Sequence, residues 1–414
     1  MSVLARRLGL ADAVAIGLGS MLGAGVFSAF APAAAAAGAG LVVGLMVAGV
    51  VAWCNAAASA QLAAQFPESG GTYVYGRRMI GPWTGYIAGW SFVVGKAASC
   101  AAMALTAAAY LAPPNLAKPI AVALVVALTG LASAGVSRTA TATKVIVVIV
   151  LGVLGVVLAS AARAPHVEAV ASGGLPHGVY GLLQSAGLLF FAFAGYARVA
   201  TMGEEVREPK RTIPRAIMIA LALTLVVYLL IGIAALAVLG PARLAATAAP
   251  LAEVATAGGW EWAAPVVRVG AGLAALGALL ALLTGVTRTA LAMARTGDLP
   301  RPLARVHPGA QVPRTAALWL GAAVTVLVLV ADLRSAIAFS SLGVLLYYFI
   351  ANLAAWRQQG SDRRYARAVH VLGAVGCVVL AATLPLAAMA AAGVVVAGGV
   401  VIRWWRLRRG AVPL

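Results

Sequence analysis

The stretch Gly17–Phe27, which reads GLGSMLGAGVF, lies near the middle of the first long apolar run of the chain. Its repeated glycines are unfavourable in a helix interior and permit a non-helical backbone. A dinucleotide-binding fingerprint would need a preceding strand and an acidic residue about 20 positions later, and neither is present. Two interpretations remain: close helix packing through small residues, or an unwound hinge within a helix.

A second interruption decides between these two interpretations. The sequence FFAFAGY, at Phe190–Tyr196, lies midway through another apolar run, five predicted helices after the first. A pair of interrupted spans at corresponding places in two halves is the best sequence indication of an inverted-repeat transporter. We therefore predict two repeats of five helices with opposite topology, because five is odd, followed by two additional helices.

The composition indicates a membrane protein. Of the 414 residues, 63% are hydrophobic and only 10% are charged, and the mean hydropathy is +0.99. A soluble protein of this length needs more polar surface. Many apolar runs reach about 20 residues, enough to cross the hydrocarbon core as a helix, and strand-like alternation is absent from them. The predicted fold class is an all-α integral membrane protein with about twelve transmembrane helices.

The predicted spans share an apolar composition bounded by loop signals. They lie near residues 9–36, 39–64, 82–112, 116–136, 140–163, 178–203, 213–240, 258–286, 312–332, 334–357, 366–384 and 386–406. We expect a single transmembrane domain over residues 1–414, with repeat one near 9–163, repeat two near 178–357 and the extra helices near 366–406.

The distribution of basic residues supports this count. The net charge of +19 would suggest a nucleic-acid partner in a soluble protein, but here the basic residues lie between apolar runs. With the N-terminus inside, 23 of the 30 Lys and Arg residues fall on the inner side and 5 on the outer side, with Lys96 and Arg198 inside spans. This bias predicts an inner (plasma) membrane protein with both termini cytoplasmic, and no nucleic-acid partner.

The polar residues do not indicate an enzyme. The four histidines are scattered in loops or at span ends. The three cysteines fall within apolar runs and lack metal-ligand spacing. We therefore predict no catalytic residue, no metal site and no cofactor. A channel would be expected to have pore-lining polar or charged rings, and none appears.

Four blocks of sequence resemble the amino acid–polyamine–organocation (APC) superfamily, in the order of that family and over roughly the first three-quarters of the chain. IGLGSMLGAGVF resembles its first-helix signature. Residues Gln65–Trp90 resemble its loop between helices 2 and 3, Phe190–Ile217 its helix 6 and following loop, and Arg288–Pro308 the stretch after helix 8. The resemblance implies a permease that transports amino acids by alternating access.

The resemblance also implies that the two breaks bind the substrate. Free N–H groups near Gly23–Gly25 suit a carboxylate, and free carbonyls near Phe193 and Ala194 suit an ammonium group. Aromatic residues there either close the site or only pack in the core. The expected substrate-binding residues are Gly19, Ser20, Met21, Gly23, Ala24, Gly25, Phe191, Phe193, Ala194, Gly195 and Tyr196.

A neutral amino acid is the expected substrate, because no Asp or Glu lies in the middle of a predicted span to pair with a cationic side chain. Two alternatives stay open. One is an exchanger of cationic amino acids or polyamines, and the other is a membrane nutrient sensor that binds without translocation. The expected partners are the amino acid, a coupling proton and membrane lipid.

Lys96 is the candidate for proton coupling, because an ionisable group in the middle of a span is a functional candidate by default. The alternative is a structural lysine bonded to carbonyls of the unwound part of helix 1. Some members of the superfamily carry a lysine deeper in helix 5, whereas Lys144 lies near the inner end of that helix here. Sodium coupling is disfavoured, because Val269–Leu283 of helix 8 contains no hydroxyl or carboxylate.

An inner gate is predicted where helix 6 meets the following loop. Its candidate residues are Arg198, Glu204 and Glu205, within a mixed-charge segment that extends to Arg211. Salt bridges there would break as the repeats move, although a solvated loop with topology charges is the alternative. Arg198 either lines the inner pathway or pairs with a loop acid.

Overall fold

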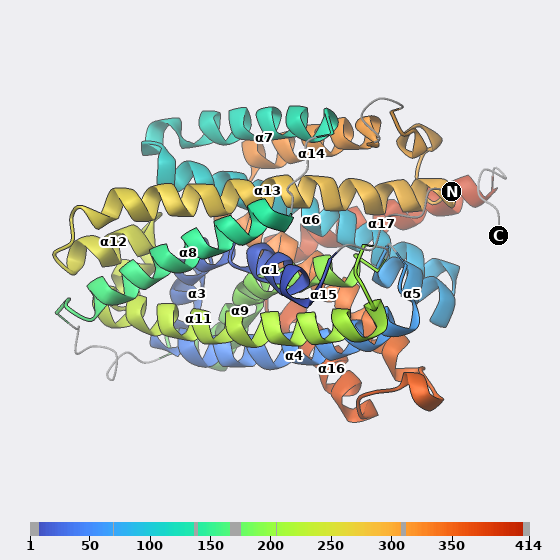
Figure 1. The fold of residues 1–414 in the computed structure, drawn as a ribbon, viewed down its shortest axis with the longest axis horizontal. Coiled ribbons are helices and arrows are strands. Elements are labelled where there is room, and N and C mark those ends of the chain that lie inside the picture. Colours follow the sequence, from blue (N-terminus) through green and yellow to red (C-terminus); the bar gives the residue numbers. More distant parts are fainter. Residues whose placement is uncertain are drawn as a thin grey trace.

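Long helices joined by short loops make up the structure (Figure 1), a computed structural model that describes residues 8–68, 70–135, 140–165, 175–203, 205–307 and 312–408. Two single-turn helices at the breaks are described below. The other α-helices are α1 (Leu10–Met21), α3 (Phe30–Ala37), α4 (Leu41–Gln65), α5 (Thr72–Met79), α6 (Pro82–Leu111), α7 (Ala117–Ser133), α8 (Ala140–Ala161), α9 (Gly178–Phe193), α11 (Pro209–Ala246), α12 (Pro250–Ala257), α13 (Ala263–Arg295), α14 (Arg314–Val330), α15 (Leu333–Trp356), α16 (Arg367–Ala382) and α17 (Leu386–Arg408).

The predicted membrane helices are confirmed within a few residues at most ends. In the part of the chain that the structure describes, ten helical segments are long and apolar enough to cross a membrane, and α14 and α16 are apolar but shorter. The largest difference is α13, which continues to Arg295 where the prediction ended at residue 286. A second is α11, which continues to Ala246 where the prediction ended at residue 240. Its backbone is non-helical at Gly240, just before Pro241, so the straight part of the helix ends where the sequence indicated.

Two short helices were not predicted. α5 lies between the second and third spans, and α12 lies between the seventh and eighth. Both have eight residues, too few to cross the hydrocarbon core, so neither changes the number of spans.

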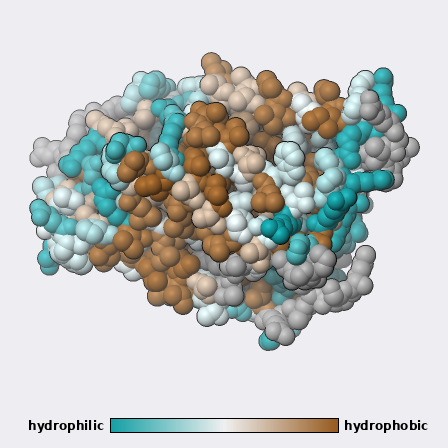
Figure 2. All heavy atoms as spheres, turned by 90° about the horizontal axis from the view of Figure 1, so that it is seen from above, coloured by the Kyte–Doolittle hydropathy of each residue, from teal (hydrophilic) through white to brown (hydrophobic). Residues whose placement is uncertain are grey.

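The outer surface of the bundle is apolar around its middle. Large aliphatic side chains are exposed there, among them Val148, Val226 and Val375 at 69%, 55% and 53%. Figure 2 shows this hydrophobic surface across the middle of the molecule and hydrophilic residues toward its two ends. A water-soluble surface rarely carries so much contiguous apolar area, whereas lipid tails match it.

The two broken helices lie at the centre of the bundle. On one side α6 packs against α13 and α15, and on the other α4 packs against α9 and α11. The segment from α1 to α3 runs between these groups, beside α9 (Figure 1). The breaks are therefore held in the protein interior, where non-helical backbone is tolerated at membrane depth.

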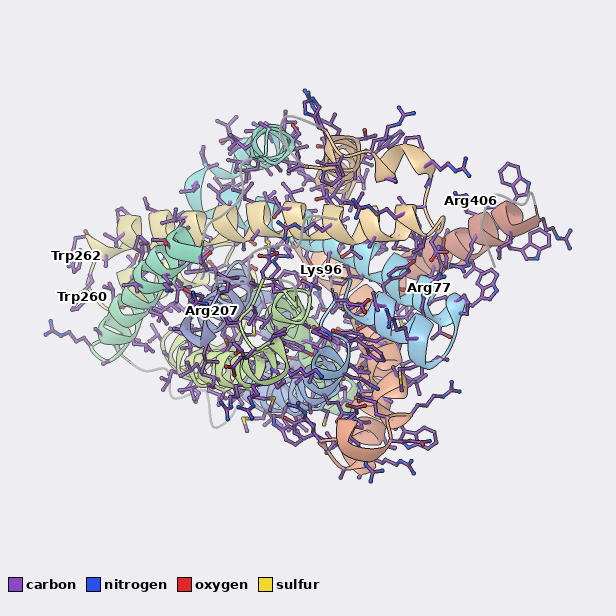
Figure 3. The ribbon with its side chains drawn as sticks, turned by 45° about the vertical axis from the view of Figure 1, so that its right-hand side comes forward. Arg77, Lys96, Arg207, Trp260, Trp262 and Arg406 are labelled. Carbon is purple, nitrogen blue, oxygen red and sulfur yellow. The ribbon has the colours of Figure 1, made fainter. Side chains whose placement is uncertain are left out.

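A buried ion cluster fixes one end of the bundle. The carboxylate of Asp298, just after α13, pairs with Arg77 of α5 at 2.9 Å and with Arg403 of α17, and it accepts a hydrogen bond from the Tyr73 hydroxyl at 2.8 Å. Figure 3 shows Arg77 at the same end as Arg406, opposite Trp260 and Trp262, with Lys96 between the two ends. These bonds to Asp298 connect α17 to the ends of α5 and α13.

Candidate functional site

The break in helix 1 follows Met21. The helix stops there, residues 22–24 are not helical, and the chain turns into the single-turn helix α2 (Gly25–Ser28), which leads into α3. The first N–H groups of a helix have no intrahelical acceptor, so those near Gly25 face the break. The hinge interpretation of the glycine-rich stretch is confirmed.

The break in helix 6 follows Phe193. The α-helical pattern gives way to a 3₁₀ turn, Ala194–Tyr196, before the short helix α10 (Ala197–Ala200). The change of hydrogen-bond pattern leaves carbonyl groups at the end of α9 without their α-helical donors. The segment predicted as the second interruption is therefore interrupted at the predicted residues.

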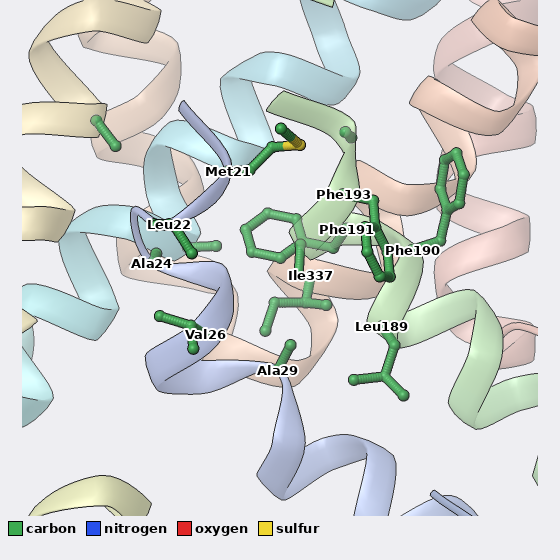
Figure 4. Packing of buried hydrophobic residues seen from close by; sticks show 14 of the residues in the cluster. Met21, Leu22, Ala24, Val26, Ala29, Leu189, Phe190, Phe191, Phe193 and Ile337 are labelled. Carbon is green, nitrogen blue, oxygen red and sulfur yellow. The ribbon is translucent and has the colours of Figure 1, made fainter. Parts of the chain in front are cut away.

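The two breaks touch each other. A Cβ atom added to Gly25 would lie 2.6 Å from the Cβ of Ala192, and one added to Gly195 would lie 2.4 Å from the carbonyl oxygen of Ser20. Only glycine permits so close a backbone approach. Figure 4 shows the neighbouring apolar side chains, including Met21 and Phe193, gathered around this contact.

Tyr228 of α11 bridges both breaks. Its hydroxyl lies 2.6 Å from the carbonyl oxygen of Met21 and 3.0 Å from that of Ala192, so its proton is shared between one carbonyl of each broken helix. The ring packs against Phe193, with centroids 5.1 Å apart. Tyr228 was not among the predicted site residues, although a tyrosine within an otherwise aliphatic stretch of a span is a signal that could have identified it.

Lys96 is buried at the break of helix 6. It lies halfway along α6, is 4% exposed, and donates a hydrogen bond from Nζ to the carbonyl oxygen of Ala194 at 3.0 Å. The lysine therefore contacts helix 6, whereas the structural alternative placed it against helix 1. Its ammonium group occupies one of the carbonyls that the sequence analysis assigned to the substrate's ammonium group.

A cavity of about 190 Å³ leads to the breaks. Ile16 and Ser20 of α1, Thr143 of α8, Arg198 of α10 and Thr284 of α13 contribute to its lining. Ser20 is the penultimate residue of α1, so the cavity reaches the first break. A smaller cavity of about 20 Å³, lined by Lys96, Ala194, Gly195 and Arg198 among others, lies against the second break.

Two ion pairs cross between the helices around the larger cavity. Glu205 accepts a hydrogen bond from Arg288 of α13 at 2.6 Å, and both residues line the cavity. Asp12 of α1 pairs with Lys144 of α8 at 2.5 Å. Glu205 was a predicted gate residue, but neither pair was predicted, because the partners are separated by 83 and 132 positions in the sequence. Glu204, the other predicted gate acid, lies outside the described residues.

The predicted binding residues divide into two groups. Ser20 lines the larger cavity, and Ala194 and Gly195 line the smaller one. The remaining ones line neither cavity in this conformation and are buried around the contact between the breaks: Gly19, Met21, Gly23, Ala24, Gly25, Phe191, Phe193 and Tyr196. Tyr196 stacks on Tyr348 of α15, with ring centroids 5.1 Å apart.

Comparison with known proteins finds a matching family model and related transporters. A family model described as "Amino acid permease" matches residues 8–403. An uncharacterised transporter of Mycobacterium tuberculosis is 57% identical over 398 residues, which cover 96% of this chain and 90% of that protein.

More distant relatives have names that mention substrates. Cationic amino acid transporter 7, a chloroplastic protein of Arabidopsis thaliana, is 30% identical over 384 residues, covering 85% of this chain and 65% of that protein. The branched-chain amino acid permease BcaP of Bacillus subtilis is 26% identical over 375 residues, covering 85% and 80% respectively.

Proposed function

The chain belongs to the amino acid permease family, and from this premise we propose that it carries neutral amino acids across the membrane with protons as the coupling ion. Membership of this family confirms the assignment to the APC superfamily that the sequence motifs indicated. It also makes the chain a multi-pass membrane transporter of amino acids, not an enzyme.

The observation that carries the proposal is the contact of the two breaks in the bundle centre, with a cavity that reaches them. When the breaks separate by the size of an amino acid head group, N–H groups near Gly25 face a carboxylate. The carbonyls of Ala192 and Ala194 face an ammonium group. Both charged groups of an amino acid then find backbone partners, and the side chain projects between the broken helices.

The preference for neutral substrate side chains follows from where the acidic residues of the protein lie. Among the described residues the one buried acid is Asp298, and two arginines neutralise it at the end of the bundle. A cationic side chain at the breaks would therefore have no carboxylate partner, and burial of an unpaired charge is costly. The similarity to a protein named as a cationic amino acid transporter supports the alternative, an exchanger of cationic amino acids or polyamines.

Proton coupling is assigned to Lys96. The Nζ atom of Lys96 lies at the second break, 3.0 Å from the carbonyl oxygen of Ala194. A protonated Lys96 adds a positive charge beside the breaks, and this charge attracts the carboxylate of a bound amino acid. Proton and amino acid then favour each other's binding, and this positive coupling is what symport requires.

Alternating access arises from movement of the two inverted repeats, near residues 9–163 and 178–357, around the breaks. The pairs Asp12–Lys144 and Glu205–Arg288 act as an inner gate, because each joins a broken helix, or the loop after it, to a neighbouring helix. The excess of basic residues on this side supports a cytoplasmic position for this side and for both termini, in the plasma (inner) membrane.

Uptake of a panel of radiolabelled amino acids into proteoliposomes, with and without an inward proton gradient, tests the proposal. We expect saturable uptake of one or a few neutral amino acids that the gradient accelerates. Saturable arginine uptake exceeding that of alanine and leucine would contradict the neutral substrate and support the alternative. Binding without uptake, in folded protein, would instead indicate an exchanger or a sensor, which counterflow into preloaded vesicles separates.

A further inference from the structure

Arg198 is a cation without a partner in the described part of the chain. It lies two residues beyond the 3₁₀ turn of helix 6 and lines both the larger and the smaller cavity. The structure gives its guanidinium no hydrogen bond or ion pair with a described residue. Glu205, the acid whose charge acts on Arg198, is already bonded to Arg288 at 2.6 Å. Its charge is therefore left facing the cavities.

The other residues that line the two cavities do not cancel the positive charge of Arg198. Lys96, which lines the smaller cavity with Arg198, is also cationic when protonated. None of the residues that line the smaller cavity is acidic, and in the larger cavity the pair Glu205–Arg288 is neutral as a unit. The cavities next to the breaks thus have a net positive lining. In such a partly enclosed space screening by salt is weaker than at an open surface.

We propose that Arg198 is the charge-selecting residue of the inner pathway, which repels cationic side chains and lets neutral or anionic ones pass. A substrate leaving the breaks through the cavity must pass this guanidinium, which lines it beside Ser20. Like charges brought together in such a space disfavour the wrong partner strongly. This inference rests on the proposed function and goes beyond it, because it names one residue and one physical cause for the substrate class.

The test uses substrate pairs that differ in charge but hardly in shape: arginine with citrulline, and diaminobutyrate with norvaline. Each compound competes for uptake of the neutral amino acid that wild-type protein takes up fastest. For wild type we expect the neutral member of at least one pair to compete, and its cationic partner to be roughly tenfold weaker or worse, the size of effect that like-charge contacts produce. In Arg198→Gln this difference should largely disappear, whereas Arg198→Lys should keep it.

Arg215→Gln is the matched control, because Arg215 is an exposed arginine of α11 that lines neither cavity. It should keep the wild-type selectivity. Equal competition by both members of each pair in wild type would overturn the inference without any variant. A wild-type difference that persists in folded, active Arg198→Gln would also overturn it. Absence of neutral amino acid uptake in wild type would instead overturn the proposed function, and the inference with it.

Discussion

Replacing Gly25 with valine is expected to lower amino acid uptake about hundredfold, because added atoms at the contact of the breaks cost about 3 kcal/mol or more. Even a Cβ at this position would lie 2.6 Å from the Cβ and 2.7 Å from the Cα of Ala192. The Cα belongs to the backbone of α9 and cannot move aside as a side chain can. The valine therefore forces the breaks apart or displaces α9.

Initial rates of uptake in proteoliposomes measure this effect, and Gly155→Val is the control. Gly155 lies in the interior of α8, is exposed, and has open space around an added Cβ. Its replacement tests valine in a membrane helix without the contact. Wild-type uptake by Gly25→Val would mean that the breaks do not need to meet during transport, and that the close packing of α2 on α9 is incidental.

Replacing Lys96 with methionine is expected to remove the stimulation of uptake by a proton gradient. Methionine has similar length and no exchangeable proton, so the contact with Ala194 loses its charge. With one proton per substrate, a gradient of one pH unit supports accumulation of up to about tenfold, since one unit corresponds to about 1.4 kcal/mol. The variant should reach only the outside concentration, by facilitated diffusion.

The measurement is the ratio of internal to external substrate at steady state, with and without the gradient. Lys118→Met is the control, because Lys118 is an exposed lysine near the start of α7 that bonds only to the carbonyl oxygen of Leu329, at 3.2 Å, among the described residues. It should accumulate substrate as wild type does. If Lys96→Met also accumulates substrate in response to the gradient, the coupling proton is carried elsewhere.

The spans and breaks could be predicted because their signals are local. About 20 consecutive apolar residues suffice to indicate a membrane helix. The glycines of Gly17–Phe27 and the motif Phe190–Tyr196 weaken the helix where they stand. The bias of basic residues toward one side then indicated an even number of spans. None of these inferences needs knowledge of which helices are neighbours.

The contacts within the site depend on that knowledge and could not be predicted. Lys96 was recognised as unusual, but its acceptor, Ala194, lies 98 positions away in the sequence. Tyr228 reaches carbonyls 207 and 36 positions away. Asp298 lies outside the predicted spans, yet it is 2% exposed, because Arg403, 105 positions later, packs onto it. Such pairs are determined by helix packing, which one sequence does not specify.

The central claim is that the two breaks bind both charged groups of one amino acid. Competition by analogues of the best neutral substrate tests it most directly: the amine that lacks the α-carboxylate, and the acid that lacks the α-ammonium group. Each analogue would leave one set of polar backbone groups unpaired in the site, so the account predicts that neither inhibits uptake at concentrations where the parent amino acid inhibits fully. If the amine or the acid alone inhibits as strongly as the parent, the substrate is not held between the two breaks.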